Sequence, residues 1–237
     1  AIYVNQPYEW QPINPQPPLL PDATPVGVYR RTIEIPDDWD GRDIYLHMAG
    51  AKSGVYVYLN GKEVGYSEDS KDPAEFLLNP YLQNGENTLT VKMYRWSTGS
   101  YLECQDFFRM SGFERDVFLW SQAKTAIHDF RVVSTLDDGY KDGIFRLGID
   151  IKNTKNASSS AKVSYQLLDD ELKPVLSGSE NINIGANSIN TIDFAGNLAS
   201  VNTWTSEHPN LYRLLIMVEQ DGETIEYVPF HVGFRRI

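Results

Sequence analysis

The chain has 237 residues, of which 41% are hydrophobic and 12% aromatic, a composition that fills a core and excludes a disordered chain. The formal net charge is −11 and no segment is rich in lysine or arginine, so we expect neither nucleic acid nor a membrane surface as a partner. No apolar run is long enough to cross a bilayer. With a single cysteine, Cys104, the chain forms no internal disulfide.

The first 25 residues contain seven prolines. Proline at this density forbids helix and interrupts β-ladders, which predicts an extended arm. A disordered tail is the alternative, but the arm carries apolar anchors that a free tail rarely has. These anchors are Tyr3, Tyr8, Trp10, Leu19 and Leu20.

After the arm, the pattern is that of successive strands. Residues 26–35 are rich in side chains that favour strands and end at a proline. In residues 54–59, aliphatic side chains alternate with tyrosines, the period of a strand with one buried face. Asn60-Gly61 then favours a type I′ turn, which predicts a hairpin with residues 62–67 as the returning strand. No segment has a sustained helical stripe, and residues 73–82 predict at most one helical turn.

The sequence changes character after the polar stretch 121–125, beyond which tyrosines become fewer and the strands more evenly spaced. Seven or so short strands in about 110 residues are typical of an immunoglobulin-like sandwich. We therefore predict an all-β chain of two domains, 1–123 and 124–237. The second domain is supported by strands with one apolar face and by Asp-Gly turns. The apolar faces are Phe145, Leu147, Ile149 and Ile151 in one strand and Tyr212, Leu214, Ile216 and Val218 in another. The turns are Asp138-Gly139, Asp142-Gly143 and Asp221-Gly222.

Residues that usually carry nucleophilic or metal chemistry are scattered. The histidines share no metal-ligand spacing and none follows a nucleophile-elbow pattern, so we interpret them as structural or surface residues. They are His47, His128, His208 and His231. Cys104 has nothing basic close by in the sequence, which favours a packing role over a thiolate nucleophile.

One segment, residues 95–112, concentrates aromatic rings, carboxylates, an amide and an arginine in a loop between strands. A sugar site needs this mixture, since ring faces stack on C–H patches while carboxylates and amides bind hydroxyls. A connector in which Arg109, Glu103 and Asp106 form ion pairs is an equal alternative on these residues alone. Glu103 and Asp106 as the carboxylate pair of a glycosidase is a weaker one, because nothing beside them indicates a general acid.

Five separated stretches carry a family resemblance. Residues 95–112, 65–76 and 25–30 resemble signature segments of the glycoside hydrolase family 2 β-galactosidases, and residues 204–212 and 232–237 resemble the segments that lead to that family's catalytic barrel. The resemblance runs from end to end in the right order. Within the family, the β-glucuronidase and β-mannosidase versions of residues 95–112 are less similar.

The resemblance implies a jelly-roll, galactose-binding-like sandwich followed by an immunoglobulin-like sandwich. In the family a (β/α)₈ barrel with both catalytic glutamates follows, and it hydrolyses terminal β-D-galactosides with retention. We expect the barrel, and a segment before Ala1, to be missing here. The chain alone is therefore predicted to be inactive, with no catalytic residue of its own.

The resemblance also implies site residues. Asp106 matches the carboxylate that contacts galactosyl hydroxyls and binds a monovalent cation, Na⁺ or K⁺, while Asn5 matches an arm asparagine that reaches the same sugar. Tyr3 is a weaker match in the wall of that pocket. Mg²⁺ and a homo-oligomeric state are expected of the longer enzyme, in the cytoplasm or periplasm of a bacterium.

Departures from the family pattern leave the shape of the pocket open. Cys104 stands where aspartate is usual, Phe108 where tryptophan is common, Phe113 where isoleucine is, and Leu77 where aspartate follows the Glu-Phe pair. Two alternatives remain on the sequence alone, a free-standing carbohydrate-binding module and a structural spacer. The natural substrate is not predicted, and we expect no measurable galactose binding by the isolated chain, because most of the galactosyl pocket would be missing.

Overall fold

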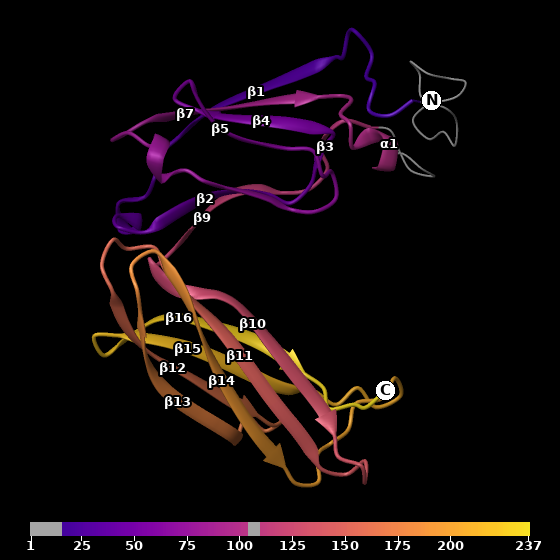
Figure 1. Cartoon of the computed structure of the whole chain (residues 1–237), viewed down its shortest axis with the longest axis vertical. Coiled ribbons are helices and arrows are strands. Elements are labelled where there is room, and N and C mark those ends of the chain that lie inside the picture. Colours follow the sequence, from indigo (N-terminus) through magenta and orange to yellow (C-terminus); the bar gives the residue numbers. More distant parts are fainter. Residues whose placement is uncertain (1–15, 104–109) are drawn as a thin grey trace. The chain divides into compact units, whose positions relative to one another are not determined.

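A computed structural model describes residues 16–103 and 110–237 (Figure 1). The chain divides into two compact units, Ala1–Gln122 and Ala123–Ile237. Strands dominate the described residues of both units, which confirms the predicted all-β class. Among the described residues, no helix is long and apolar enough to span a membrane.

The first unit is a sandwich built on a four-stranded sheet in the order β1-β7-β4-β5 and a three-stranded sheet in the order β6-β2-β9, with β3 and β8 paired beside them. The short helices η1, η2 and α1 lie in the connections. The elements are β1 (Val26–Ile33), η1 (Asp37–Trp39), β2 (Asp43–Met48), β3 (Ala51–Lys52), β4 (Gly54–Leu59), β5 (Lys62–Ser67), β6 (Ala74–Leu77), η2 (Asn79–Tyr81), β7 (Asn87–Tyr94), α1 (Ser100–Glu103), β8 (Gly112–Phe113) and β9 (Val117–Gln122).

The predicted hairpin is present as β4 and β5. Val55, Val57 and Leu59 point into the core and are at most 1% exposed, and burial of each contributes roughly 1.5–3 kcal/mol. At the turn, Asn60 and Gly61 have φ angles of 53° and 80°, the positive pair that a type I′ turn requires. The local pattern was therefore sufficient to predict this element.

The segment 73–82 is more regular than the sequence indicated. Ala74–Leu77 forms the edge strand β6, antiparallel to β2, and only Asn79–Tyr81 makes a helical turn, of the 3-10 type. The expectation of at most one helical turn in the segment is thus confirmed, while the strand in its first half was not predicted. The pairing with β2 is a long-range contact that the four residues of β6 do not encode by themselves.

The second unit is a sandwich of seven strands in two sheets, β10-β11-β14 and β13-β12-β15-β16. Tyr212, at the start of β15, accepts a hydrogen bond on its hydroxyl from the Asn202 backbone N–H at 3.0 Å, the arrangement of the tyrosine corner in immunoglobulin-like sandwiches. The strands are β10 (Thr125–Leu136), β11 (Gly143–Asn153), β12 (Ser159–Leu168), β13 (Pro174–Ile184), β14 (Ser188–Leu198), β15 (Tyr212–Gln220) and β16 (Glu223–Val232).

The predicted one-faced strands fill the core of this unit, where Phe145, Leu147 and Ile149 are fully buried. The turn before β11 confirms one of the two predicted Asp-Gly pairs, since the Tyr140 backbone N–H donates to the Asp137 carbonyl at 3.1 Å and closes a turn over Asp138-Gly139. Its positive φ angle, 55°, falls on Tyr140, and Gly143 is the first residue of β11. A Cβ at Gly143 would come within 2.7 Å of two core side chains, so glycine is required there by packing.

Candidate functional site

The residues that flank the 104–109 stretch lie at the end of the first unit where β7 stops, next to the described end of the arm. The backbone N–H of Arg95 donates to the Pro25 carbonyl at 3.0 Å. From α1, the Tyr101 hydroxyl donates to the Leu19 carbonyl. In Figure 1, α1 accordingly lies at the end of the unit that the arm reaches. Two segments about 80 positions apart in the sequence are thus held together here.

Three buried serines hold the start of the loop that follows β7 against the corner between β3 and β4. The Ser53 hydroxyl donates to the Ser97 hydroxyl at 2.5 Å and shares a hydrogen bond with the Ser100 hydroxyl at 3.0 Å. The Ser100 oxygen also accepts the Ser97 backbone N–H at 3.0 Å. All three side chains are at most 4% exposed, so their hydroxyls need these partners.

Glu103, the last residue of α1, ties the helix to the loop between β5 and β6. One of its carboxylate oxygens accepts the Ser70 backbone N–H at 2.8 Å and the other accepts the Ser70 hydroxyl. Ser70 is fully buried. Hydrogen bonds to an ionised group are stronger than neutral ones, so this contact fixes the position from which residues 104–109 depart.

Glu68 forms a second tie between the same two loops. The Thr98 hydroxyl lies 2.6 Å and 2.8 Å from its two carboxylate oxygens, and the Tyr66 hydroxyl donates to it at 2.8 Å. The bond from Thr98 is the main reason that the pKa of Glu68 lies below its ordinary value. For Tyr66, burial raises the pKa, so its hydroxyl stays protonated and remains a donor.

The predicted site residues Asn5, Tyr3 and Asp106 lie outside the described residues, as do Cys104 and Phe108. Among the described residues, the end of the arm at Leu19 contacts α1 through the Tyr101 hydroxyl. The connector and sugar-site interpretations both involve Glu103, Asp106 and Arg109. Of these three, only Glu103 is among the described residues, and it bonds to Ser70.

Sequence reasoning missed Glu68, Ser70 and Thr98 as the residues that hold the loop. Glu68 and Ser70 lie in the second family-like segment, and polar residues directly after a strand were the only signal available. For one histidine the structure agrees with the interpretation as a structural residue. His47 stacks on Phe118 with ring centroids 4.5 Å apart. Among the described residues, no three His, Cys, Asp or Glu side chains are grouped to hold a metal ion.

Both units match models of a known protein family. Residues 1–123 match the model of the sugar binding domain of glycosyl hydrolases family 2, and residues 125–235 match a second model of the same family. The chain belongs to glycosyl hydrolase family 2. The resemblance in the sequence is thereby confirmed.

Curated relatives are named beta-galactosidase. The Priestia megaterium protein is 39% identical over 237 residues, which cover 98% of this chain and 23% of the relative. The Streptococcus thermophilus protein is 36% identical, with 99% of this chain and 22% of the relative covered. The chain therefore spans about a quarter of the length of the curated relatives that it matches.

Solved structures share the fold of the two units. A Bacteroides uniformis beta-glucuronidase 2, covalently bound to cyclophellitol-6-carboxylate aziridine, aligns with a TM-score of 0.82 at 19% identity over 90% of this chain and 26% of the solved one. A Bacteroides fragilis structure described as a putative beta-galactosidase aligns with a TM-score of 0.79 at 20% identity over 89% and 33%. At these identities the likeness establishes the fold.

Proposed function

We propose that this chain is the non-catalytic front part of a β-galactosidase that hydrolyses terminal β-D-galactosides with retention. The observation that supports this most is the end-to-end similarity to relatives named beta-galactosidase, of which this chain matches only a part. The catalytic glutamates of such an enzyme would lie outside this chain. We therefore expect the 237-residue chain to release no product from a chromogenic β-galactoside.

Within that enzyme, the role we propose for the chain is to present Asp106, Asn5 and Tyr3 to the galactosyl group. This role is supported by the hydrogen bonds between Glu103 and Ser70 and between Tyr101 and Leu19. They hold the described parts of the two segments against one end of the sandwich. A rigid scaffold lowers the entropic cost of ordering a sugar-binding loop. The Asp106 carboxylate would accept sugar hydroxyls.

The same carboxylate is our proposed ligand for Na⁺ or K⁺. A hard cation takes carboxylate and hydroxyl oxygens, and the described residues at and beside α1 include the carboxylates of Glu68 and Glu103 and the hydroxyls of Ser70 and Thr98. The Mg²⁺ expected of the longer enzyme is not assigned to residues of this chain. The enzyme is proposed to be a homo-oligomer.

The test is Asp106→Asn in the longer enzyme, with Asp116→Asn as the matched control. Asp116 is an exposed aspartate just before β9, and its side chain has no partner among the described residues. We expect Asp106→Asn to lower kcat/KM about 100-fold, because sugar hydroxyl contacts strengthen in the transition state. Activation by Na⁺ or K⁺ should be lost in that variant and kept in the control. Normal cation activation in Asp106→Asn would contradict the proposal.

A further inference from the structure

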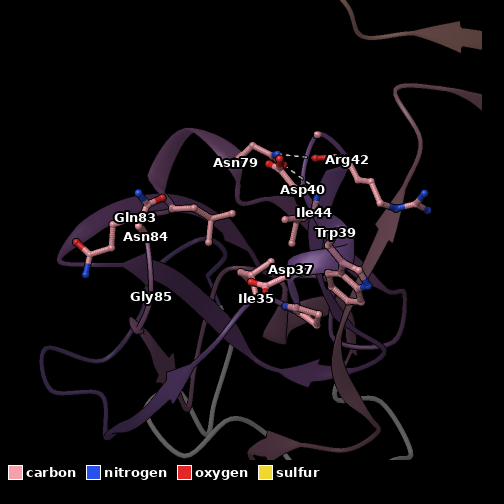
Figure 2. A pocket seen from close by; sticks show the side chains of 13 residues that line it. Ile35, Asp37, Trp39, Asp40, Arg42, Ile44, Asn79, Gln83, Asn84 and Gly85 are labelled. Atoms are coloured by element: carbon pink, nitrogen blue, oxygen red, sulfur yellow. Dashed lines mark hydrogen bonds between the residues drawn. The ribbon is translucent and has the colours of Figure 1, made fainter.

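A pocket of about 590 Å³ opens at the end of the first unit where β2 and β7 begin, opposite the end that holds residues 95–103 (Figure 2). Its volume falls in the range of small-molecule sites, roughly 300–1,000 Å³. η1 and the residues after it form one side, and the loop before β7 forms another. In Figure 2, Gln83 and Asn84 lie on one side of the pocket and Trp39 on the other, with Asp37 between them.

Two asparagines hold these walls in place. Asn79, in η2, accepts the Ile44 backbone N–H at 2.7 Å and donates to the Arg42 carbonyl at 2.8 Å, which joins η2 to the start of β2. Asn87 is 1% exposed and bonds to the backbone of Gln83 on both its N–H and its carbonyl. The pocket is therefore pre-formed, which lowers the cost of binding a ligand.

The ionisable residues that line the pocket differ in the hydrogen bonds that their side chains make. The guanidinium of Arg42 is bonded to Ser121, through its Nε to the hydroxyl at 2.8 Å and through a terminal nitrogen to the carbonyl at 3.1 Å. The carboxylates of Asp37 and Asp40 are exposed and bond to no other residue in the part of the chain that the structure describes. The pocket thus offers strong acceptors and repels anions.

The remaining lining groups complete a set suited to hydroxyls. Trp39 is half-buried and supplies an apolar surface, and the Asn84 amide supplies a donor and an acceptor. An uncharged ligand with many hydroxyls and apolar C–H faces satisfies all of these groups together. An anion would meet the two carboxylates, and an apolar ligand would leave them desolvated without partners.

We propose that this pocket binds a neutral saccharide, with hydroxyls donating to Asp37 and Asp40 and the sugar ring against Trp39. The inference goes beyond the proposed function, since it concerns the sandwich end away from residues 95–103. It would give the enzyme a second contact to a glycan. Because one sugar makes only a few contacts in the pocket, we expect a dissociation constant of about 1 mM.

The test is a titration of the isotopically labelled 237-residue chain with lactose, followed by backbone amide and indole N–H signals in NMR. We expect saturable shifts at the Trp39 indole and at the amides of Gln83 and Asn84. Glucuronic acid should bind at least several-fold more weakly, because its carboxylate is repelled. No saturation by about 50 mM lactose, far above the expected dissociation constant, would overturn the proposal.

Paired variants test whether the pocket carboxylates hold the sugar. Asp37→Asn combined with Asp40→Asn should weaken lactose binding about tenfold, whereas Asp38→Asn, on the same helix but outside the pocket lining, should leave it unchanged. Equal binding by all variants would overturn the proposal, as would saturable binding of a lysine tripeptide in place of lactose. Shifts confined to residues 95–103 would also overturn it and would instead support sugar contact at the arm, so the two proposals fail separately.

Discussion

The two ends of the first unit differ in how they use their carboxylates. Where β7 ends, Glu68 and Glu103 accept hydrogen bonds from neighbouring loops and hold those loops together. Where β7 begins, the carboxylates of Asp37 and Asp40 bond to no described residue, and the loops there are held by amides. A carboxylate that is already saturated by the protein supports a site, while one that is left open can bind a ligand.

The two ends also differ in whether the side chains that fix the loops carry a charge. At the pocket end, neutral asparagine side chains satisfy backbone groups, so the walls are fixed without consuming a charge. At the arm end, the ties are charge-assisted and depend on ionised glutamates. The two ends should therefore respond differently to amide substitution and to pH.

The largest effect is expected from Asn87→Ala. Its side chain makes four hydrogen bonds at 2.8–3.0 Å, three of them to the loop before β7, and its removal leaves buried groups unpaired. We expect the free energy of unfolding of the first unit to fall by about 3 kcal/mol. Urea unfolding followed by the amide signals of β4 and β7 measures it.

Asn84→Ala is the control, because Asn84 is an exposed amide in the same loop. Its effect should stay within about 0.5 kcal/mol. If both variants lose the same stability, Asn87 does not hold the pocket wall, and the view of the pocket as pre-formed is wrong.

A smaller effect is expected from Glu103→Gln at the other end. The change keeps the shape but replaces two charge-assisted bonds to Ser70 by weaker ones. The first unit should lose about 2 kcal/mol in the same urea experiment. Glu86→Gln, an exposed glutamate before β7, should lose less than about 0.5 kcal/mol. A loss in Glu103→Gln no larger than in this control would show that the tie does not stabilise the unit.

Some of these features were predictable because they are local. The alternation that ends at Leu59 and the Asn60-Gly61 pair carry both the faces and the turn of one hairpin within a short stretch of chain. Of the two Asp-Gly pairs predicted as turns before β11, Asp138-Gly139 lies in a turn, whereas Gly143 is the first residue of β11 and the left-handed position falls on Tyr140. Steric preference alone does not decide which residue of a longer turn takes a positive φ angle.

The ties and the pocket were not predictable, because they join residues far apart in the sequence. Glu103 and Ser70 are 33 positions apart, and Asn79 meets Ile44 across 35. In the sequence, Asn87 is one asparagine near a strand start, and nothing in its neighbours indicates that it is buried. Its role depends on loop closure, which side-chain patterns do not encode.

The smallest effect concerns pH at the arm end and is tested with Thr98→Val. The folded-state pKa of Glu68 lies below its ordinary value of 4.5, mainly through the Thr98 hydroxyl. Its contribution to stability is therefore present above about pH 4.5 and is lost as the pH falls through the folded-state pKa. In Thr98→Val the pKa of Glu68 should rise, as measured by carbon-detected NMR titration, and the share of the unit's stability that is lost in acid should become smaller. Thr98→Ser keeps the hydroxyl and should restore the low pKa. A titration of Glu68 that is the same in all three proteins would show that the tyrosine and backbone donors hold this carboxylate without Thr98.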